Sequence, residues 1–145
     1  MASKTPRVAW DTCVFIDCLQ KSAGRIEHIE PMVRDAESGK LHIIASTLVL
    51  TETLHLGGGG TPDEIAAIAK FFRNDYIHIY AADQVIAEIA RDIRRADKLS
   101  TEDAIHLATA LAWQERESVD LTMATHDLAL ATAARASGMR VVGAG

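Results

Sequence analysis

Four carboxylates stand within or beside apolar segments that are spread along the whole chain. Asp11 follows residues 8–10, Asp127 follows residues 121–126, Glu52 lies within 48–54, and Asp103 opens the Ala- and Leu-rich stretch 103–113. Side chains in these positions can meet at one edge of a folded sheet, where their like charges would repel unless protons or a cation neutralised them. Oxygen-only ligands favour Mg²⁺ or Mn²⁺ over zinc. The sequence therefore predicts a metal-dependent enzyme that acts on a phosphate ester.

Alternating strand-like and helix-like segments predict an α/β fold with a mostly parallel sheet. We expect strands at 7–10, 41–45, 76–80, 121–124 and 139–142. Helices are expected at 12–19, 24–39, 62–73 and 83–95, from about 101, and from 127 to 138, with a further helix that begins near 46 or 47 and carries Glu52. Pro31 should bend or split the helix at 24–39.

The expected sheet also places the acids. In an open parallel sheet, ligands bind beyond the carboxyl ends of the strands. Asp11 and Asp127 occupy that position, Asp103 falls in the first turn of its helix, and Glu52 is expected about two turns into its own. The four side chains can therefore point into one crevice.

Size and composition indicate one globular domain. The chain has 145 residues, of which 48% are hydrophobic and 24% charged, enough for a single core. We predict a flexible N-terminus over residues 1–6 and a single domain over residues 7–145. No apolar run approaches the roughly 18 residues that span a bilayer, and the start lacks an apolar signal core. We therefore expect a cytoplasmic protein without a membrane partner, in which Cys13 and Cys18 are reduced.

Each acid also has a purely structural explanation. Asp11 and Asp127 could cap the helices that follow them, and Ser100 with Asp103 fits a capping box. Glu52 is harder to explain in this way, because it lies against apolar neighbours, where an unpaired carboxylate is costly. The conjunction of all four favours a site over unrelated caps.

Three further side chains lie close to these acids in the sequence. Thr125 could orient Asp127 or a metal-bound water, or it could simply end its strand. His106 could hydrogen-bond across the site, or it could be an ordinary helix histidine. Asp17 is expected to be an outward-facing salt-bridge partner.

A single concentrated basic stretch leads towards Asp103. It consists of Arg91, Arg94, Arg95 and Lys98. Such a run is either a solvated face or a grip on a polyanionic backbone. The net charge of -5 opposes a generally basic nucleic-acid surface, so RNA binding would depend on this local stretch. Few aromatic residues accompany it, which gives base stacking little support.

Several other catalytic motifs are absent from the sequence. The glycine run 57–60 lacks the Lys-Ser/Thr ending of a P-loop, and no GxGxxG follows a strand. No Cys/His cluster has zinc-site spacing, and no G-x-S-x-G elbow marks an α/β-hydrolase. Phosphatases with an aspartyl nucleophile would have a second aspartate at the position of Cys13.

Taken in order, four segments resemble the PIN-domain family, and most closely the VapC-type toxins of bacterial toxin–antitoxin pairs. The segments are VAWDTCVFID at 8–17, STLVLTE at 46–52, LSTEDAIHLATA at 99–110 and ATHD at 124–127. The resemblance implies a flavodoxin-like, three-layer α/β/α sandwich and an Mg²⁺- or Mn²⁺-dependent endoribonuclease. Asp11, Glu52, Asp103 and Asp127 match the family's acidic quartet, and Thr125 matches its small hydroxyl residue.

In the resulting hypothesis, Asp11 and Asp103 bind the metal most directly, while Glu52 and Asp127 act through water or a second ion. The family often has asparagine where this chain has Cys13, which alters a contact around the metal ligands. The glycine run should make the loop after residue 56 flexible.

The resemblance also implies an RNA substrate, an antitoxin protein that covers the acidic groove, and a homodimer. Three alternatives stay open: an RNA-processing PIN nuclease, a catalytically silent PIN-like module that binds RNA or protein, and a receiver-like signalling domain. The acids do not select among RNA targets, because selectivity must come from loops and dimer shape.

Overall fold

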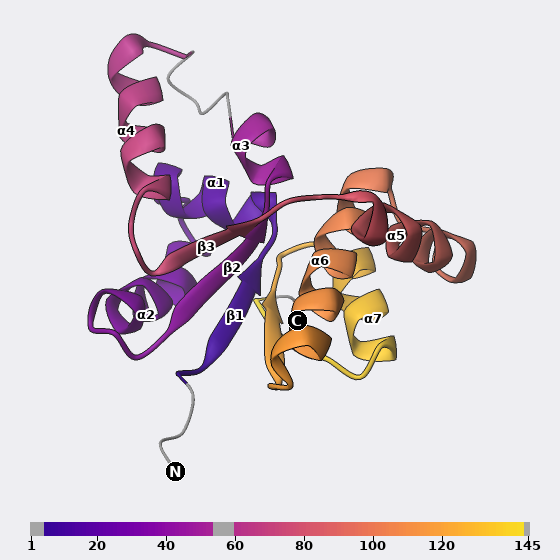
Figure 1. The fold of residues 1–145 in the computed structure, drawn as a ribbon. Coiled ribbons are helices and arrows are strands. Elements are labelled where there is room, and N and C mark those ends of the chain that lie inside the picture. Colours follow the sequence, from indigo (N-terminus) through magenta and orange to yellow (C-terminus); the bar gives the residue numbers. More distant parts are fainter. Residues whose placement is uncertain (1–4, 54–59, 144–145) are drawn as a thin grey trace.

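Five strands form one parallel sheet in the order β3-β2-β1-β4-β5. The strands are β1 (Arg7–Trp10), β2 (His42–Ser46), β3 (Ile77–Tyr80), β4 (Leu121–Ala124) and β5 (Arg140–Val142). The computed structural model describes residues 5–53 and 60–143 (Figure 1). Most of the residues predicted to form a flexible N-terminus, 1–4, lie outside that range. The predicted α/β class with a parallel sheet is confirmed.

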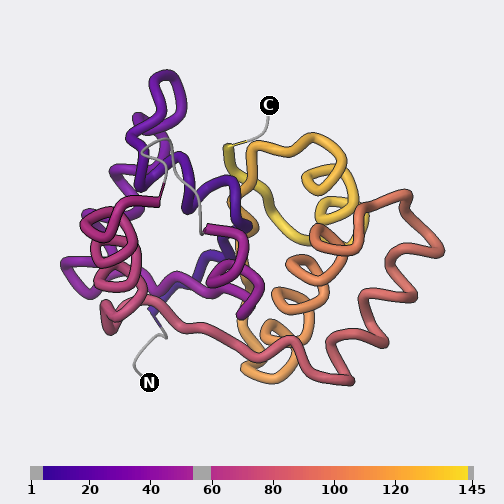
Figure 2. The backbone as a smooth tube through the Cα atoms, turned by 90° about the horizontal axis from the view of Figure 1, so that it is seen from above, coloured from indigo at the N-terminus to yellow at the C-terminus, as the bar shows by residue number. Residues whose placement is uncertain are grey.

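Helices cover both faces of this sheet (Figures 1 and 2). One face carries α1 (Thr12–Gln20), α2 (Ile26–Glu37), α3 (Leu48–Glu52) and α4 (Pro62–Phe72). The other face carries α5 (Gln84–Ala96), α6 (Thr101–Glu117) and α7 (Leu128–Ala136). The result is the three-layer α/β/α sandwich that the sequence predicts.

The sheet separates two buried clusters of apolar side chains. Successive residues of a strand point to opposite faces. In β1, Val8 and Trp10 accordingly pack with Phe15 and the first group of helices. Ala9 packs with Leu107 and the second group. Because β1 is buried on both faces, the position of the residue that follows it, Asp11, is well defined.

Two helices differ from their predicted form. The helix α2 is a single helix with Pro31 inside it, so the proline does not split it. The helix α3 is shorter than expected and ends at Glu52, which is therefore its last residue. The glycine loop predicted to be flexible falls largely on residues 57–59, outside the described part. No helix in the described ranges is both long and apolar enough to cross a membrane.

Candidate active site

Asp11 and Asp127 lie at the point where the order of strands reverses. Strand β1 pairs with β2 on one side and β4 on the other, and Trp10 is aligned with Ala124 at the ends of β1 and β4. Asp11 follows β1 directly, and Asp127 begins α7 just beyond β4. Adjacent parallel strands that feed opposite faces leave a crevice at this edge. The fold therefore brings these two acids to the position where ligands bind in such sheets.

Both oxygens of the Asp11 carboxylate have partners. Oδ1 accepts a hydrogen bond from the backbone N–H of Val14 at 3.2 Å and one from the thiol of Cys13 at 3.0 Å. Oδ2 accepts from the hydroxyl of Thr125 at 2.5 Å. Asp11 is only 2% exposed. The helix-cap explanation is correct for this residue, and the cap fixes the carboxylate at the edge of the site.

Asp127 is held in a similar way. Its Oδ1 accepts from the backbone N–H of Leu130 at 2.9 Å, so it caps α7. Its own N–H donates to the hydroxyl oxygen of Thr125 at 3.0 Å. Thr125 is fully buried and connects Asp11 to Asp127 through one oxygen atom. The sequence suggested that Thr125 orients Asp127 or a metal-bound water, or simply ends its strand; in the structure its hydroxyl contacts the carboxylate of Asp11 and the backbone N–H of Asp127 instead of the Asp127 carboxylate.

Asp103 lies within electrostatic reach of both of these acids. Its N–H donates to Ser100 Oγ at 3.1 Å, which places the side chain in the first turn of α6 as predicted. Burial raises the pKa of Asp103, and the charges of Asp127 and Asp11 raise it further. Like charges at close range oppose ionisation. Asp103 is therefore near enough to Asp11 and Asp127 for its pKa to be affected by their charges.

The fourth acid, Glu52, has a different environment. Its Oε1 accepts from the hydroxyl of Thr12 at 2.6 Å and lies 3.0 Å from Nε2 of His106. These contacts, the one with His106 foremost, lower the pKa of Glu52. The hydrogen bond across the site that was one of two possibilities for His106 is present, and it ties α3 to α6. Within the described residues, Nδ1 of His106 is buried without a hydrogen-bond partner.

The donor chemistry of the three aspartates suits a hard divalent cation. Carboxylate oxygens are the usual ligands of Mg²⁺ and Mn²⁺, and a bound cation would relieve the repulsion that raises the pKa of Asp103. In the described part of the chain, however, no three Asp, Glu, His or Cys side chains converge closely enough to form a ligand set. The three aspartates would suit such an ion by the chemistry of their oxygens.

A contact that sequence reasoning missed lies beside Thr125. His126 Nδ1 is 2.7 Å from Oδ2 of Asp17, and Arg25 donates to the same oxygen at 3.2 Å. Asp17 is 6% exposed, so its predicted outward orientation is wrong, although it does form a salt bridge. The spacing along α1 could have indicated this orientation, because Asp17 lies one turn beyond Cys13, on the face of α1 that meets residues 125 and 126.

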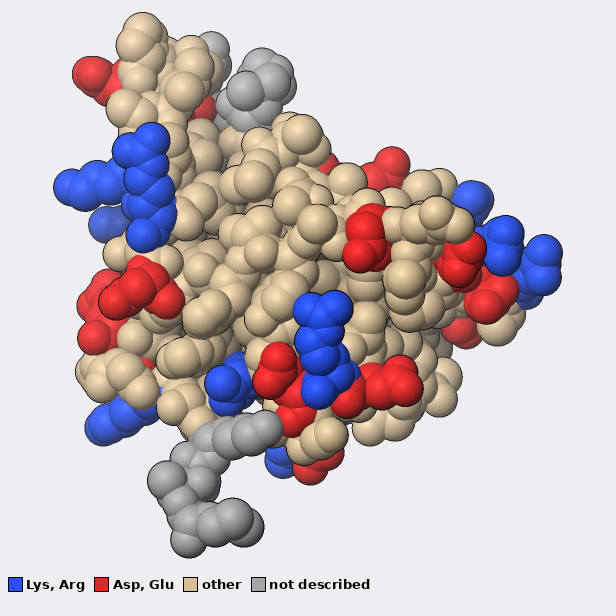
Figure 3. Space-filling view, in the orientation of Figure 1, with Lys and Arg blue, Asp and Glu red and all other residues tan. Residues whose placement is uncertain are grey.

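The predicted basic residues line an open groove of about 590 Å³ between α5 and the start of α6. Figure 3 shows Lys and Arg side chains gathered over α5, beside acidic ones. The lining residues are Ala87, Ala90, Arg91, Arg94, Arg95, Lys98, Leu99, Thr101 and Ile105.

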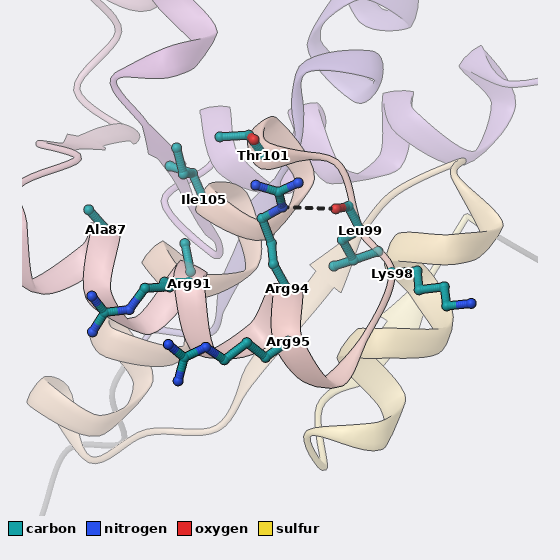
Figure 4. Close-up of a pocket in the computed structure, with 9 residues that line it drawn as sticks. Ala87, Arg91, Arg94, Arg95, Lys98, Leu99, Thr101 and Ile105 are labelled. Carbon is teal, nitrogen blue, oxygen red and sulfur yellow. Dashed lines mark hydrogen bonds between the residues drawn. The ribbon is translucent and has the colours of Figure 1, made fainter.

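The cations around this groove do not converge on one point. Arg94 Nε donates to the carbonyl of Leu99 at 3.3 Å, Arg91 and Arg95 extend to one side, and Lys98 extends to the other (Figure 4). The groove meets α6 at Thr101 and Ile105. Residues two positions away on a helix point to the far side, so Asp103 lies on the opposite flank of α6. The groove and the acids are separate surfaces that meet at the helix N-terminus.

Comparison with known proteins agrees with this architecture. Residues 8–141 match the model of the PIN domain, and the chain belongs to the PIN-domain family. No curated protein matches the sequence.

Among solved structures, the chain is similar to VapBC2 from Rickettsia felis bound to a promoter DNA fragment, with a TM-score of 0.65, 12% identity and coverage of 93% of this chain and 96% of that one. It is also similar to VapC20 of Mycobacterium tuberculosis, a toxin that cleaves the sarcin–ricin loop. The TM-score is 0.64 and the identity 18%, with coverage of 87% of this chain and 94% of that one. A toxin–antitoxin complex from Klebsiella pneumoniae is similar with a TM-score of 0.53 and 23% identity, and the match covers 83% of this chain and 86% of that one. The PIN resemblance is confirmed, and VapC-type structures share its fold.

Proposed function

We propose that this protein is a metal-dependent endoribonuclease that hydrolyses RNA phosphodiester bonds at the carboxyl edge of its sheet. The observation that carries the proposal is that Asp11 and Asp127 lie at the reversal of strand order, with Asp103 near enough for its pKa to be affected by both charges. Burial, and after it the charges of Asp127 and Asp11, raises the pKa of Asp103, and a divalent cation would relieve the repulsion among these carboxylates. Membership of the PIN-domain family supports the same reading.

Each side chain has a distinct task in this proposal. Asp11, Asp103 and Asp127 would hold an Mg²⁺ or Mn²⁺ ion, which supplies polarisation of a phosphodiester oxygen and a lower pKa for attacking water. Thr125 fixes Asp11 relative to Asp127. Glu52, which the sequence suggested as a further ligand, is engaged by Thr12 and His106. It would hold α3 against α6 at the rim and reach an ion only through water.

RNA would enter beside the acids and extend into the basic groove. Phosphate contacts position a nucleic acid without reading its sequence. Arg91, Arg94, Arg95 and Lys98 are spread along the groove, an arrangement that suits an extended backbone better than a single phosphate. An RNA that engaged both surfaces would pass over the N-terminus of α6.

The biological setting of the proposal is a toxin–antitoxin pair. The similar structures include VapBC2, a toxin–antitoxin complex and the toxin VapC20, which cleaves the sarcin–ricin loop. These similarities support an antitoxin partner and an RNA substrate. A homodimer and a cytoplasmic location follow from the same reading and stay predictions. An antitoxin gene beside this one would distinguish the toxin from an RNA-processing PIN nuclease.

The experiment that tests the proposal is cleavage of a panel of structured RNAs, including ribosomal and transfer RNA, by purified protein. We expect cutting with Mg²⁺ or Mn²⁺, none with chelator, recovery when metal is restored, and none by a folded Asp11→Asn variant. Cutting that persists in chelator or in both Asp11→Asn and Asp103→Asn would contradict the assignment. Binding of RNA or a partner protein with no cutting and no metal binding would favour the silent binding module.

A further inference from the structure

The segment 125–127 carries two residues of the proposed site and, between them, a histidine that does not face the site. The side chain of His126 is only 6% exposed, and its Nδ1 lies 2.7 Å from Oδ2 of Asp17. An ionised carboxylate only accepts hydrogen bonds, so the imidazole donates. The pair therefore connects α1 to the loop after β4.

The contact is part of a longer seam between α1 and this segment. Cys13, one turn before Asp17, has its sulfur 4.0 Å from Oγ1 of Thr125 and 3.0 Å from Oδ1 of Asp11. The backbone of Thr125 is held on its other side by a hydrogen bond from its N–H to the carbonyl of Val142 at 3.1 Å. One face of α1 and the end of β5 thus enclose the segment from both sides.

Gly143 closes this enclosure. Its φ of +93° lies in the left-handed region, which glycine adopts without penalty. A Cβ at this position would come within 2.9 Å of the carbonyl oxygen of Thr125 and 3.2 Å of Cδ2 of His126. The imidazole is therefore packed between α1 and the chain after β5, and it has little freedom to rotate.

We propose that Asp17 and His126 are positioning residues, which hold segment 125–127 against α1 and so set where Asp127 stands relative to Asp11 and Asp103. This inference rests on the proposed function. His126 is linked to the site through few atoms. Thr125 and Asp127 are its immediate neighbours in the chain, and the Asp127 N–H donates to Thr125 Oγ1 across it. Groups that hydrogen-bond directly to metal ligands typically alter metal affinity by about 10–100-fold, so this less direct contact should act at the lower end of that range.

The test uses full-length protein and two readouts that need no RNA: the Mn²⁺ dissociation constant and hydrogen exchange at the Asp127 amide. His126→Leu keeps the size of the side chain and removes the donor, whereas His126→Asn restores an N–H near the position of Nδ1. We expect His126→Leu to weaken Mn²⁺ binding about tenfold and to speed exchange at Asp127. His126→Asn should recover most of both losses.

Arg25→Ala is the matched control, because it removes the other partner of Asp17 from a side chain that is 53% exposed and leaves His126 in place. We expect wild-type Mn²⁺ affinity and exchange. Should His126→Leu fail to fold, Asp17→Asn retains the shape of the pair without its charge and should give a smaller loss in the same direction.

Wild-type affinity and wild-type exchange in His126→Leu would overturn the inference, as would equal losses in His126→Leu and Arg25→Ala. Absence of Mn²⁺ binding by the wild-type protein would instead count against the proposed function. In that event the exchange rate of the Asp127 amide alone decides between a positioning role and none.

Discussion

The hydroxyl of Thr125 donates to Oδ2 of Asp11 at 2.5 Å, although the two residues are 114 positions apart in the sequence. This bond joins the segment after β4 to the residue after β1 at the centre of the sheet. Because the same oxygen accepts from the Asp127 N–H, a single buried side chain relates two of the proposed metal ligands.

Removing that hydroxyl should impair the site without unfolding the protein. Thr125→Val is nearly isosteric and leaves Asp11 Oδ2 and the Asp127 N–H without their shared partner. We expect kcat/KM for RNA cleavage to fall about 10–100-fold, while Thr125→Ser, which keeps the hydroxyl, stays within a few-fold of wild type. Steady-state cleavage rates check this prediction, and equal activity of Thr125→Val and wild type would contradict it.

Asp103 should destabilise the metal-free protein at neutral pH. Its folded-state pKa is raised above the ordinary 3.8 by burial and by Asp127 and Asp11, so the folded state keeps its proton to higher pH than the unfolded chain does. Stability therefore falls as pH rises through this interval, and the penalty is fully present above it.

Asp103→Asn should accordingly raise Tm by about 1–3 °C at pH 7 in chelator, with no gain below pH 3.8. Asp92→Asn, an exposed change on α5, is the control for loss of one negative charge. Thermal unfolding across pH measures both variants. A lower Tm for Asp103→Asn than for Asp92→Asn at pH 7 would show that no repulsion is relieved.

The parallel sheet and the positions of Asp11 and Asp127 at its edge were predictable because each rests on a local signal that the tertiary structure does not reverse, whereas the three layers were expected from the family resemblance. Apolar runs indicated the strands, and acids directly after them fall at the carboxyl edge of any parallel sheet. Side-chain pairs across the site were not predictable in the same way. The pairing of Asp17 with His126 joins residues 109 positions apart, and only the register of β1 beside β4 brings them together.

The partner of Glu52 was likewise not predictable from the sequence. Its apolar neighbours correctly indicated an acid in need of a partner, but the sequence did not distinguish a metal ion from a histidine. The short helix α3 ends at Glu52, which leaves its carboxylate beside His106 and Thr12. Those partners come from α1 and α6, 40 and 54 positions away in the sequence, and local pattern does not predict such contacts.

Replacing His106 should remove the hydrogen bond to Glu52 and make the free energy of unfolding depend less on pH in the acid range. The pKa of Glu52 is lowered below 4.5, chiefly by His106, so the stabilisation is present above 4.5 and disappears as pH falls through the folded-state pKa. His106→Leu should cost about 1–2 kcal/mol at pH 7 and flatten the decline below pH 4.5.

His106→Gln, which retains a donor, is the control for this change and should preserve part of the dependence. Denaturant unfolding between about pH 3 and pH 7 makes the comparison. Identical pH profiles for wild type and His106→Leu would mean that the bond contributes nothing to folding.

Cys13 should be unreactive in the folded protein despite its place beside the site. Burial, with the adjacent Asp11 charge, raises the pKa of its thiol to about 12, and only the thiolate is a good nucleophile. Iodoacetamide at about pH 8 should label Cys13 at least about tenfold more slowly in native than in unfolded protein. Peptide mass spectrometry gives both rates, and equal labelling would refute the buried environment.

The basic groove should contribute to RNA affinity rather than to chemistry. Arg91→Ala with Arg95→Ala removes two cations that extend from α5. We expect KM to rise several-fold with kcat nearly unchanged. The slope of log affinity against log salt should become shallower by about 1 for each RNA phosphate that the variant no longer neutralises. Arg34→Ala on α2 is the matched control. An unchanged salt slope would assign the groove no role in RNA binding.

We expect Asp11, Asp103 and Asp127 together to hold the divalent ion that cleavage requires. Mn²⁺ binding to RNA-free protein, measured by calorimetry for wild type and for each single Asp→Asn variant, tests it most directly. We predict saturable binding by the wild type and at least about a tenfold loss of affinity in each variant, with Asp92→Asn unchanged. Wild-type affinity in all three site variants would contradict this claim and place the ion elsewhere.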